Sequence, residues 1–177
     1  MSKGPFLPSD FIPTKFSSAA DKADFGNALL HFLDADCPQG LFTEKLYRRL
    51  SMTFGHIAHY DRSGFYDTWF TRARHRAAFV EKTLHWPCHG DPEFTFSDAE
   101  SAIQQVMRER NYFGRFELKA AEALRAAELR DLERLEAKYR SQKPQENVNT
   151  AIDPTPEVNP DSSSSSFDVA IQISKEA

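Results

Sequence analysis

Histidine and cysteine side chains in the middle of the chain could bind a metal ion. His56 and His59 are three residues apart, so on a helix they would lie on one face and could share a ligand. Farther along, His85, Cys88 and His89 supply more nitrogen and sulfur donors within five consecutive residues. Such donors suit tetrahedral zinc. The sequence therefore allows a zinc site made of His56, His59, Cys88 and either His85 or His89.

The same imidazoles could serve general acid–base catalysis, because histidine titrates near neutral pH. A metal-dependent or histidine-based enzyme centred on His56, His59 and the Cys88 loop is thus one hypothesis. The spacing of these histidines and the cysteine matches no known zinc finger, and no nucleophile or oxyanion donor stands out in the sequence. The alternative is that both histidines are surface or partly buried residues hydrogen-bonded to their neighbours.

Basic residues of the same region point to an anionic partner. Residues 41–90 contain eight Lys and Arg against four Asp and Glu, although the whole chain has a net charge of −4. None of three arginines at positions 72–76 has an acidic residue three or four positions away on a helix, where it could relieve their repulsion. The candidate partner-binding residues are Lys45, Arg48, Arg72, Arg74 and Arg76.

These residues favour a non-catalytic binding or accessory protein over an enzyme. Its basic, aromatic central region would engage an anionic protein or nucleoprotein surface, and direct nucleic-acid binding is a further possibility. A negative net charge argues against general DNA binding. The competing interpretation is that the arginines pair internally with Asp91, Glu93 or acidic groups of the last helix.

The periodicity of apolar residues predicts a mainly α fold: a small compact domain of about five helices over residues 1–140, preceded by an extended, proline-rich arm. The first helix should be capped by Ser17 or Ser18 and stop at Cys37. A capping-box sequence at Ser97 should open the fourth helix, which continues through Met107. The other three helices are expected at 43–60, 65–84 and 115–140.

The helix expected at 115–140 carries an apolar seam with a seven-residue repeat. Arg125 and Glu128 interrupt this seam and argue against a long dimeric coiled coil. The seam consists of Leu118, Ala121, Leu132, Leu135 and Tyr139.

Residues 141–177 are expected to form a disordered acidic tail, because their Ser- and Pro-rich composition offers too little apolar surface to fold. Near its end, the segment 167–173 alternates apolar and polar residues like a strand that pairs with a partner's sheet. The start of the sequence lacks the charged and then apolar pattern expected of a signal peptide, and no apolar run is long enough to cross a membrane. We therefore expect a cytoplasmic protein without membrane contact, in which Cys37 and Cys88 stay reduced.

Overall fold

The computed structural model describes residues 4–56 and 61–140, and within these ranges the chain is helical without any strand. The predicted mainly α fold is confirmed, with six α-helices in place of about five. The expected tail and its segment 167–173 lie outside the described residues. The elements are η1 (Pro8–Asp10), α1 (Ala19–Asp34), η2 (Gln39–Leu41), α2 (Glu44–Met52), α3 (Arg62–Trp69), α4 (Ala73–His85), α5 (Ser97–Glu109) and α6 (Tyr112–Arg140).

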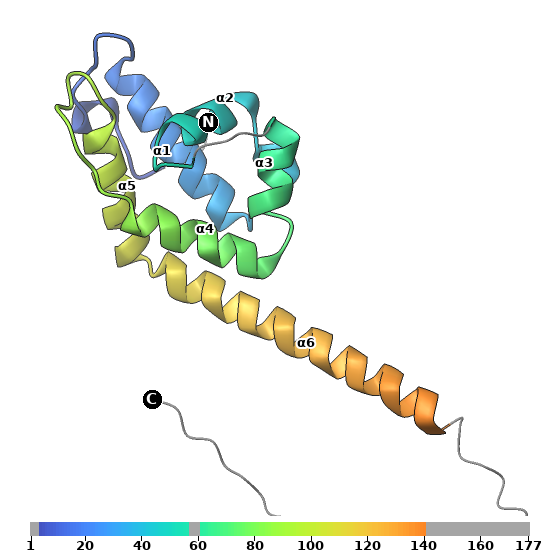
Figure 1. Ribbon diagram of the computed structural model, residues 1–177. Coiled ribbons are helices and arrows are strands. Elements are labelled where there is room, and N and C mark those ends of the chain that lie inside the picture. Colours follow the sequence, from blue (N-terminus) through green and yellow to red (C-terminus); the bar gives the residue numbers. More distant parts are fainter. Residues whose placement is uncertain (1–3, 57–60, 141–177) are drawn as a thin grey trace, which may run out of the picture.

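Helices α1 to α5 gather into one body, and α6 lies along its edge (Figure 1). The first half of α6 packs against α4, and the second half extends away from the body. None of the helices within the described residues has the length and apolar character needed to cross a membrane.

Helix α1 forms where the sequence predicts it. The Ser18 side chain accepts a hydrogen bond from the backbone N–H of Asp21, and the Asp21 carboxylate accepts one in return from the backbone N–H of Ser18. This capping box satisfies backbone donors that no helical carbonyl can reach. At the other end, Asp36 and Cys37 adopt positive φ angles of 66° and 58°, which ends the helix and turns the chain.

Aromatic rings from three helices and two connecting segments fill the centre of the body. The fully buried ring of Phe70 packs edge-on against Phe32 of α1 with 4.8 Å between centroids, and against Phe79 of α4 at 4.7 Å. Phe42 and Phe65 complete the cluster, with their rings stacked 5.8 Å apart. Edge-on and offset contacts of this kind add to the free energy gained by burying the rings.

The single helix predicted for 65–84 is wrong, because the chain breaks between Trp69 and Ala73 into α3 and α4. The spacing of apolar residues continues across the break, so the sequence pattern gives no sign of it. The break lets Phe70 enter the core, and its freed carbonyl accepts a 2.6 Å hydrogen bond from Nε of Arg76. Trp69, expected on the inner face, is only partly buried.

The helix predicted for 43–60 is also too long, because α2 ends at Met52. The Thr53 hydroxyl donates to the Arg49 carbonyl, and Phe54 and Gly55 then take positive φ angles of 50° and 55°. A side chain on Gly55 would collide with the ring of Trp86, so glycine is needed here for close approach as well as for conformation. Residues 57–60 lie outside the described part.

Helix α5 begins as predicted, but the expected capping box is wrong. Phe96 occupies the N-cap position and Ser97 is the first helical residue. The Ser97 hydroxyl instead donates to the carbonyl of Gly90, which ties the preceding loop to the start of α5.

The predicted N-terminal arm packs across the body and is anchored by two buried rings, Phe6 and Phe11. The Asn27 side chain bonds the backbone of Phe6 in both directions, at 3.1 and 2.9 Å. Gly26 leaves room for the Phe6 ring, which a Cβ would meet at 2.6 Å. The arm therefore has a fixed course over α1.

Candidate functional site

The first proposed metal ligand, His56, is a buried core residue. Its ring stacks on Phe79 with 4.4 Å between centroids, and Nε2 lies 3.0 Å from the Thr83 hydroxyl. Burial lowers the pKa of His56 to about 3, with a smaller contribution from the charge of Lys82. The imidazole is therefore neutral at physiological pH.

Three of the other proposed donors, His85, Cys88 and His89, lie on or near the surface. His85 is exposed, and its Nδ1 lies 2.8 Å from the Glu81 carbonyl of its own helix. Burial raises the pKa of the Cys88 thiol, and His89 is exposed. His59 lies outside the described residues. Across 4–56 and 61–140, the structure brings together no three His, Cys, Asp or Glu side chains that could hold a metal ion. Cys37 and Cys88 are unbridged.

Two of the five basic candidates are paired with nearby acids on the surface. Lys45 lies 3.3 Å from Asp24 and 3.7 Å from Asp21, so it bridges α2 to α1. Arg48 contacts Glu44 one turn earlier at 2.8 Å. These exposed pairs reduce the positive potential that a large anionic partner would meet.

A third candidate, Arg76, pairs internally with an acid that the sequence did not suggest. Its guanidinium lies 2.7 Å from Asp36, whose other oxygen accepts a 2.8 Å hydrogen bond from Lys119 of α6. Burial raises the pKa of Asp36, but the hydrogen bonds and charges of Lys119 and Arg76 outweigh it and hold the pKa below its usual value. This three-residue cluster joins the turn after α1 to α4 and α6.

Arg72 and Arg74 are exposed, and neither forms an ion pair with any described residue. Nε of Arg74 donates a hydrogen bond to Nε2 of His75, at 3.2 Å. Arg72 has an extended backbone at the N-cap of α4, so it precedes the helix that carries Arg74 and Arg76. Both exposed arginines remain candidates for an external contact.

A groove on the surface collects three large apolar side chains that the sequence analysis did not single out. Phe16 is 84% exposed, Met52 77% and Phe94 65%. They come from the N-terminal arm, the end of α2 and the loop before α5, yet they line one groove of about 490 Å³. Trp86 lines the same groove. No local pattern reveals this cluster, because its members are up to 78 positions apart.

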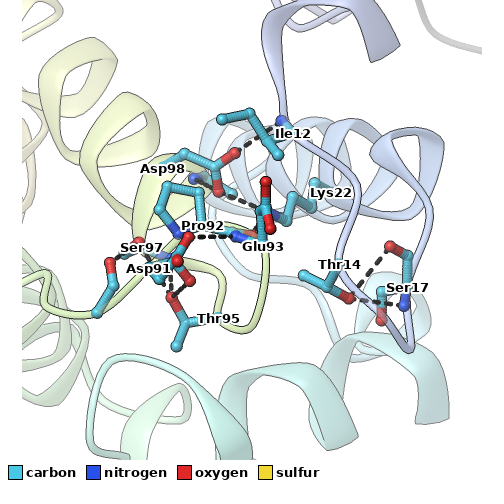
Figure 2. A network of polar contacts seen from close by, with 12 residues as sticks. Ile12, Thr14, Ser17, Lys22, Asp91, Pro92, Glu93, Thr95, Ser97 and Asp98 are labelled. Carbon is cyan, nitrogen blue, oxygen red and sulfur yellow. Dashed lines mark hydrogen bonds and ion pairs between the residues drawn. The ribbon is translucent and has the colours of Figure 1, made fainter.

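A polar network fixes the N-terminal arm and the loop before α5, which form two walls of the groove (Figure 2). The ammonium of Lys22 in α1 is fully buried and donates to Asp98 of α5 at 2.7 Å and to the Pro92 carbonyl at 2.9 Å. The second oxygen of Asp98 accepts the backbone N–H of Ile12 in the arm. One lysine–carboxylate pair thus fixes both the arm and the loop.

The arm and the loop also bond to each other directly. The backbone N–H of Lys15 donates to the Glu93 carbonyl at 3.1 Å, immediately before the exposed ring of Phe16. The Thr14 hydroxyl accepts the backbone N–H of Ser17 at 2.7 Å and closes the turn that carries Phe16. These bonds order the groove walls before any ligand arrives.

Arg49 lies between this groove and a second hollow of about 390 Å³ formed by α1 and α2. Its guanidinium sits 3.9 Å above the ring of Phe96, a cation–π distance. Burial lowers the pKa of Arg49, and the charge of Asp21 acts against this shift. Among the described residues no carboxylate lies within ion-pair distance of the Arg49 guanidinium. Sequence reasoning missed Arg49 because its setting depends on Phe96, far along the chain.

Glu100 adds an acidic group to the same groove. It is buried, and burial raises the pKa of its carboxyl, although hydrogen bonds from the Phe54 backbone and the Trp86 side chain oppose the shift. The groove therefore combines exposed apolar side chains with Arg49 on one wall and a Glu100 carboxyl that is already hydrogen-bonded. Comparisons of the chain with protein-family models, with characterised proteins and with solved structures found no significant match.

Proposed function

We propose that this protein is a non-catalytic binding protein whose groove receives a short segment of a partner protein. The segment carries a large apolar side chain next to an aspartate or glutamate. The observation that carries the proposal is the half-buried Arg49, stacked on Phe96 at the edge of the apolar groove without a carboxylate partner in the described chain.

The apolar half of the ligand follows from the side chains that line the groove. Phe16, Met52 and Phe94 expose most of their surface to water at one place. Covering apolar surface contributes about 25 cal/mol per Å². Contiguous exposed apolar side chains on a folded domain are typical of a binding site.

The acidic half follows from Arg49. A guanidinium presents a planar fork of donors that matches a carboxylate with two hydrogen bonds. Stacking on Phe96 already restricts the Arg49 side chain, so less conformational entropy is lost on binding. A partly desolvated guanidinium without an acid gains more from an incoming carboxylate than a fully hydrated one does.

A protein segment fits this site better than a nucleic acid. A phosphate backbone needs several cations at regular distances. Lys45, Arg48 and Arg76 are already paired with acids of this chain. Arg72 and Arg74 are exposed and could contact an acidic surface of the same partner protein.

The test is a selection of random twelve-residue peptides displayed on phage by the full-length chain, followed by fluorescence anisotropy of the selected peptides. We expect a large apolar residue close to Asp or Glu in the selected sequences. Arg49→Gln should weaken binding at least about tenfold, the loss of one charge-assisted pair. Replacing the peptide's acid with its amide should weaken binding to the wild type by a similar factor. The same replacement should weaken binding to the Arg49→Gln variant little further.

Arg48→Gln is the matched control, because it removes a neighbouring exposed charge and should leave peptide affinity unchanged. Deleting residues 141–177 should also leave peptide affinity unchanged. Peptides without an acid, or equal losses in the Arg48 and Arg49 variants, would contradict the proposal. Tighter peptide binding after the deletion would assign the groove to the chain's own tail, and Arg49-dependent binding of single-stranded DNA would assign it to nucleic acid.

A further inference from the structure

Helix α6 has two different sides, and only one of them is covered within the described chain. Phe116 is buried, and Ala127 is half-buried farther along the same side. This side packs on α4 along the first half of α6 (Figure 1). The large apolar side chains elsewhere on α6 are exposed to water: Leu118, Leu124, Leu129, Leu132, Leu135 and Tyr139.

These exposed side chains form a continuous stripe. Residues of an α-helix are separated by about 100° around its axis, so Leu118 points roughly 160° away from Phe116. Leu132 and Tyr139 follow Leu118 at multiples of seven residues, and Leu135 follows Ala121 in the same way. The result is a coiled-coil seam about 32 Å long, directed away from α4.

Two charged residues, Arg125 and Glu128, occupy the centre of this seam. Both are exposed, and neither forms an ion pair with another residue of the described chain. In a parallel pair of α6 helices, each would face its own copy, and like charges would meet at two successive layers. In an antiparallel pair, Arg125 of each helix faces Glu128 of the other.

The same antiparallel register aligns the rest of the seam. With Arg125 opposite Glu128, Leu118 lies opposite Leu135 and Ala121 lies opposite Leu132. A small residue faces a large one, and Leu118 faces Leu135. The same register places Tyr139 opposite Gly114, near the start of the second α6, so every leucine and alanine of the seam lies against an apolar residue.

The same antiparallel register also suits the residues beside the seam. Leu124 and Leu129 flank the seam on its two opposite sides. Glu117, next to the seam near the start of α6, comes close to Lys138 of the second copy near the end of its α6. Opposite charges at such flanking positions set the orientation of paired helices.

We propose that α6 is a dimerisation helix that pairs antiparallel with α6 of a second copy of this chain, about a two-fold axis between Ala126 and Ala127. The self-complementary charges of Arg125 and Glu128 select this partner and this direction. The α4 contact is undisturbed because it uses the other side of α6. The two bodies come to lie at opposite ends of the helix pair.

The experiment is sedimentation velocity of the full-length chain over a concentration series. A seam of three heptads is at the small end of stable interfaces, so we expect dimer formation in the micromolar range, complete by about 200 µM. Arg125→Glu and Glu128→Arg should each weaken dimerisation at least about tenfold, because each places two pairs of like charges at the centre.

An equimolar mixture of these two variants provides the decisive measurement. One chain then carries acids at both positions and the other carries arginines, so an antiparallel heterodimer has two favourable pairs and should form at least as tightly as the wild type. Arg130→Glu is the same charge reversal on the side of α6 that points away from the seam, and it should leave dimerisation unchanged. Circular dichroism checks that every variant keeps its helix content.

A chain that stays monomeric at about 200 µM would overturn the proposal. So would single variants that dimerise like the wild type, or a mixture of folded variants that does not associate. None of these outcomes depends on the groove, because α6 and the groove are separate surfaces.

Discussion

Replacing Lys22 with methionine should destabilise the fold strongly, although the change preserves the length of the side chain. The Lys22 side chain is 0% exposed, and its ammonium is the donor to both Asp98 and the Pro92 carbonyl. Removing one partner of a buried ion pair typically costs about 3–5 kcal/mol, because a charge is left without compensation.

The expected cost lies near the lower end of that range. The Asp98 side chain is 17% exposed and keeps its hydrogen bonds from the backbone N–H groups of Ile12 and Ala99. Methionine also fills the space of the lysine stem. We expect a loss of about 3 kcal/mol in the free energy of unfolding and a fall in Tm of roughly 10 °C.

Urea denaturation followed by circular dichroism measures the loss. Lys45→Met is the matched control: this lysine side chain is 67% exposed, and its ion pairs should be worth at most about 1 kcal/mol. Adding Asp98→Asn to Lys22→Met should recover part of the loss, because the stranded charge is removed. A Lys22→Met chain as stable as the control, or no recovery in the double variant, would refute this account of the network.

Further predictions concern the core, the charges and the proposed metal. Phe70→Ala should cost about 3–5 kcal/mol and Trp69→Ala clearly less, because only the first ring is fully buried; equal losses in urea denaturation would contradict this. The folded state holds the pKa of His56 at about 3, whereas the unfolded chain leaves it near its usual value of about 6.5. The free energy of unfolding should therefore fall by up to about 1.4 kcal/mol for each pH unit below pH 6.5. His56→Phe should flatten that part of the profile of stability against pH. Arg76→Glu should lower Tm because it breaks an ion pair and a hydrogen bond to a core carbonyl, whereas Arg72→Glu should not. EDTA should leave Tm unchanged, and a fall in Tm on chelation would restore the zinc hypothesis.

Local features of the sequence predicted the helices whose ends depend on nearby residues. Ser18 caps α1 through Asp21, three residues away, so its start could be read directly. The Ala-, Glu-, Leu- and Arg-rich composition predicted α6 over 115–140, and the observed helix begins only three residues earlier, at Tyr112. Intrinsic propensity decides such segments because few other contacts compete with it.

Predictions were wrong where the core overrode a local pattern. The apolar periodicity runs unbroken from Phe65 to Leu84, but Phe70 gains more by entering the aromatic cluster than by continuing α3. Similarly, α2 stops early because the turn at Gly55 packs against Trp86. Neither contact has a signal within a single helical window.

The sequence by itself determined the mainly α class, the capped start of α1, the extended arm, and the charged seam of α6, because each depends on residues a few positions apart. Only the tertiary structure decided which charges are paired and which surface is open. Lys22 meets Asp98 across 76 positions and Arg76 meets Asp36 across 40, and Arg49 comes to rest on Phe96. Charges and apolar side chains act over a few ångströms of space, so their partners depend on how the helices pack rather than on their spacing along the chain.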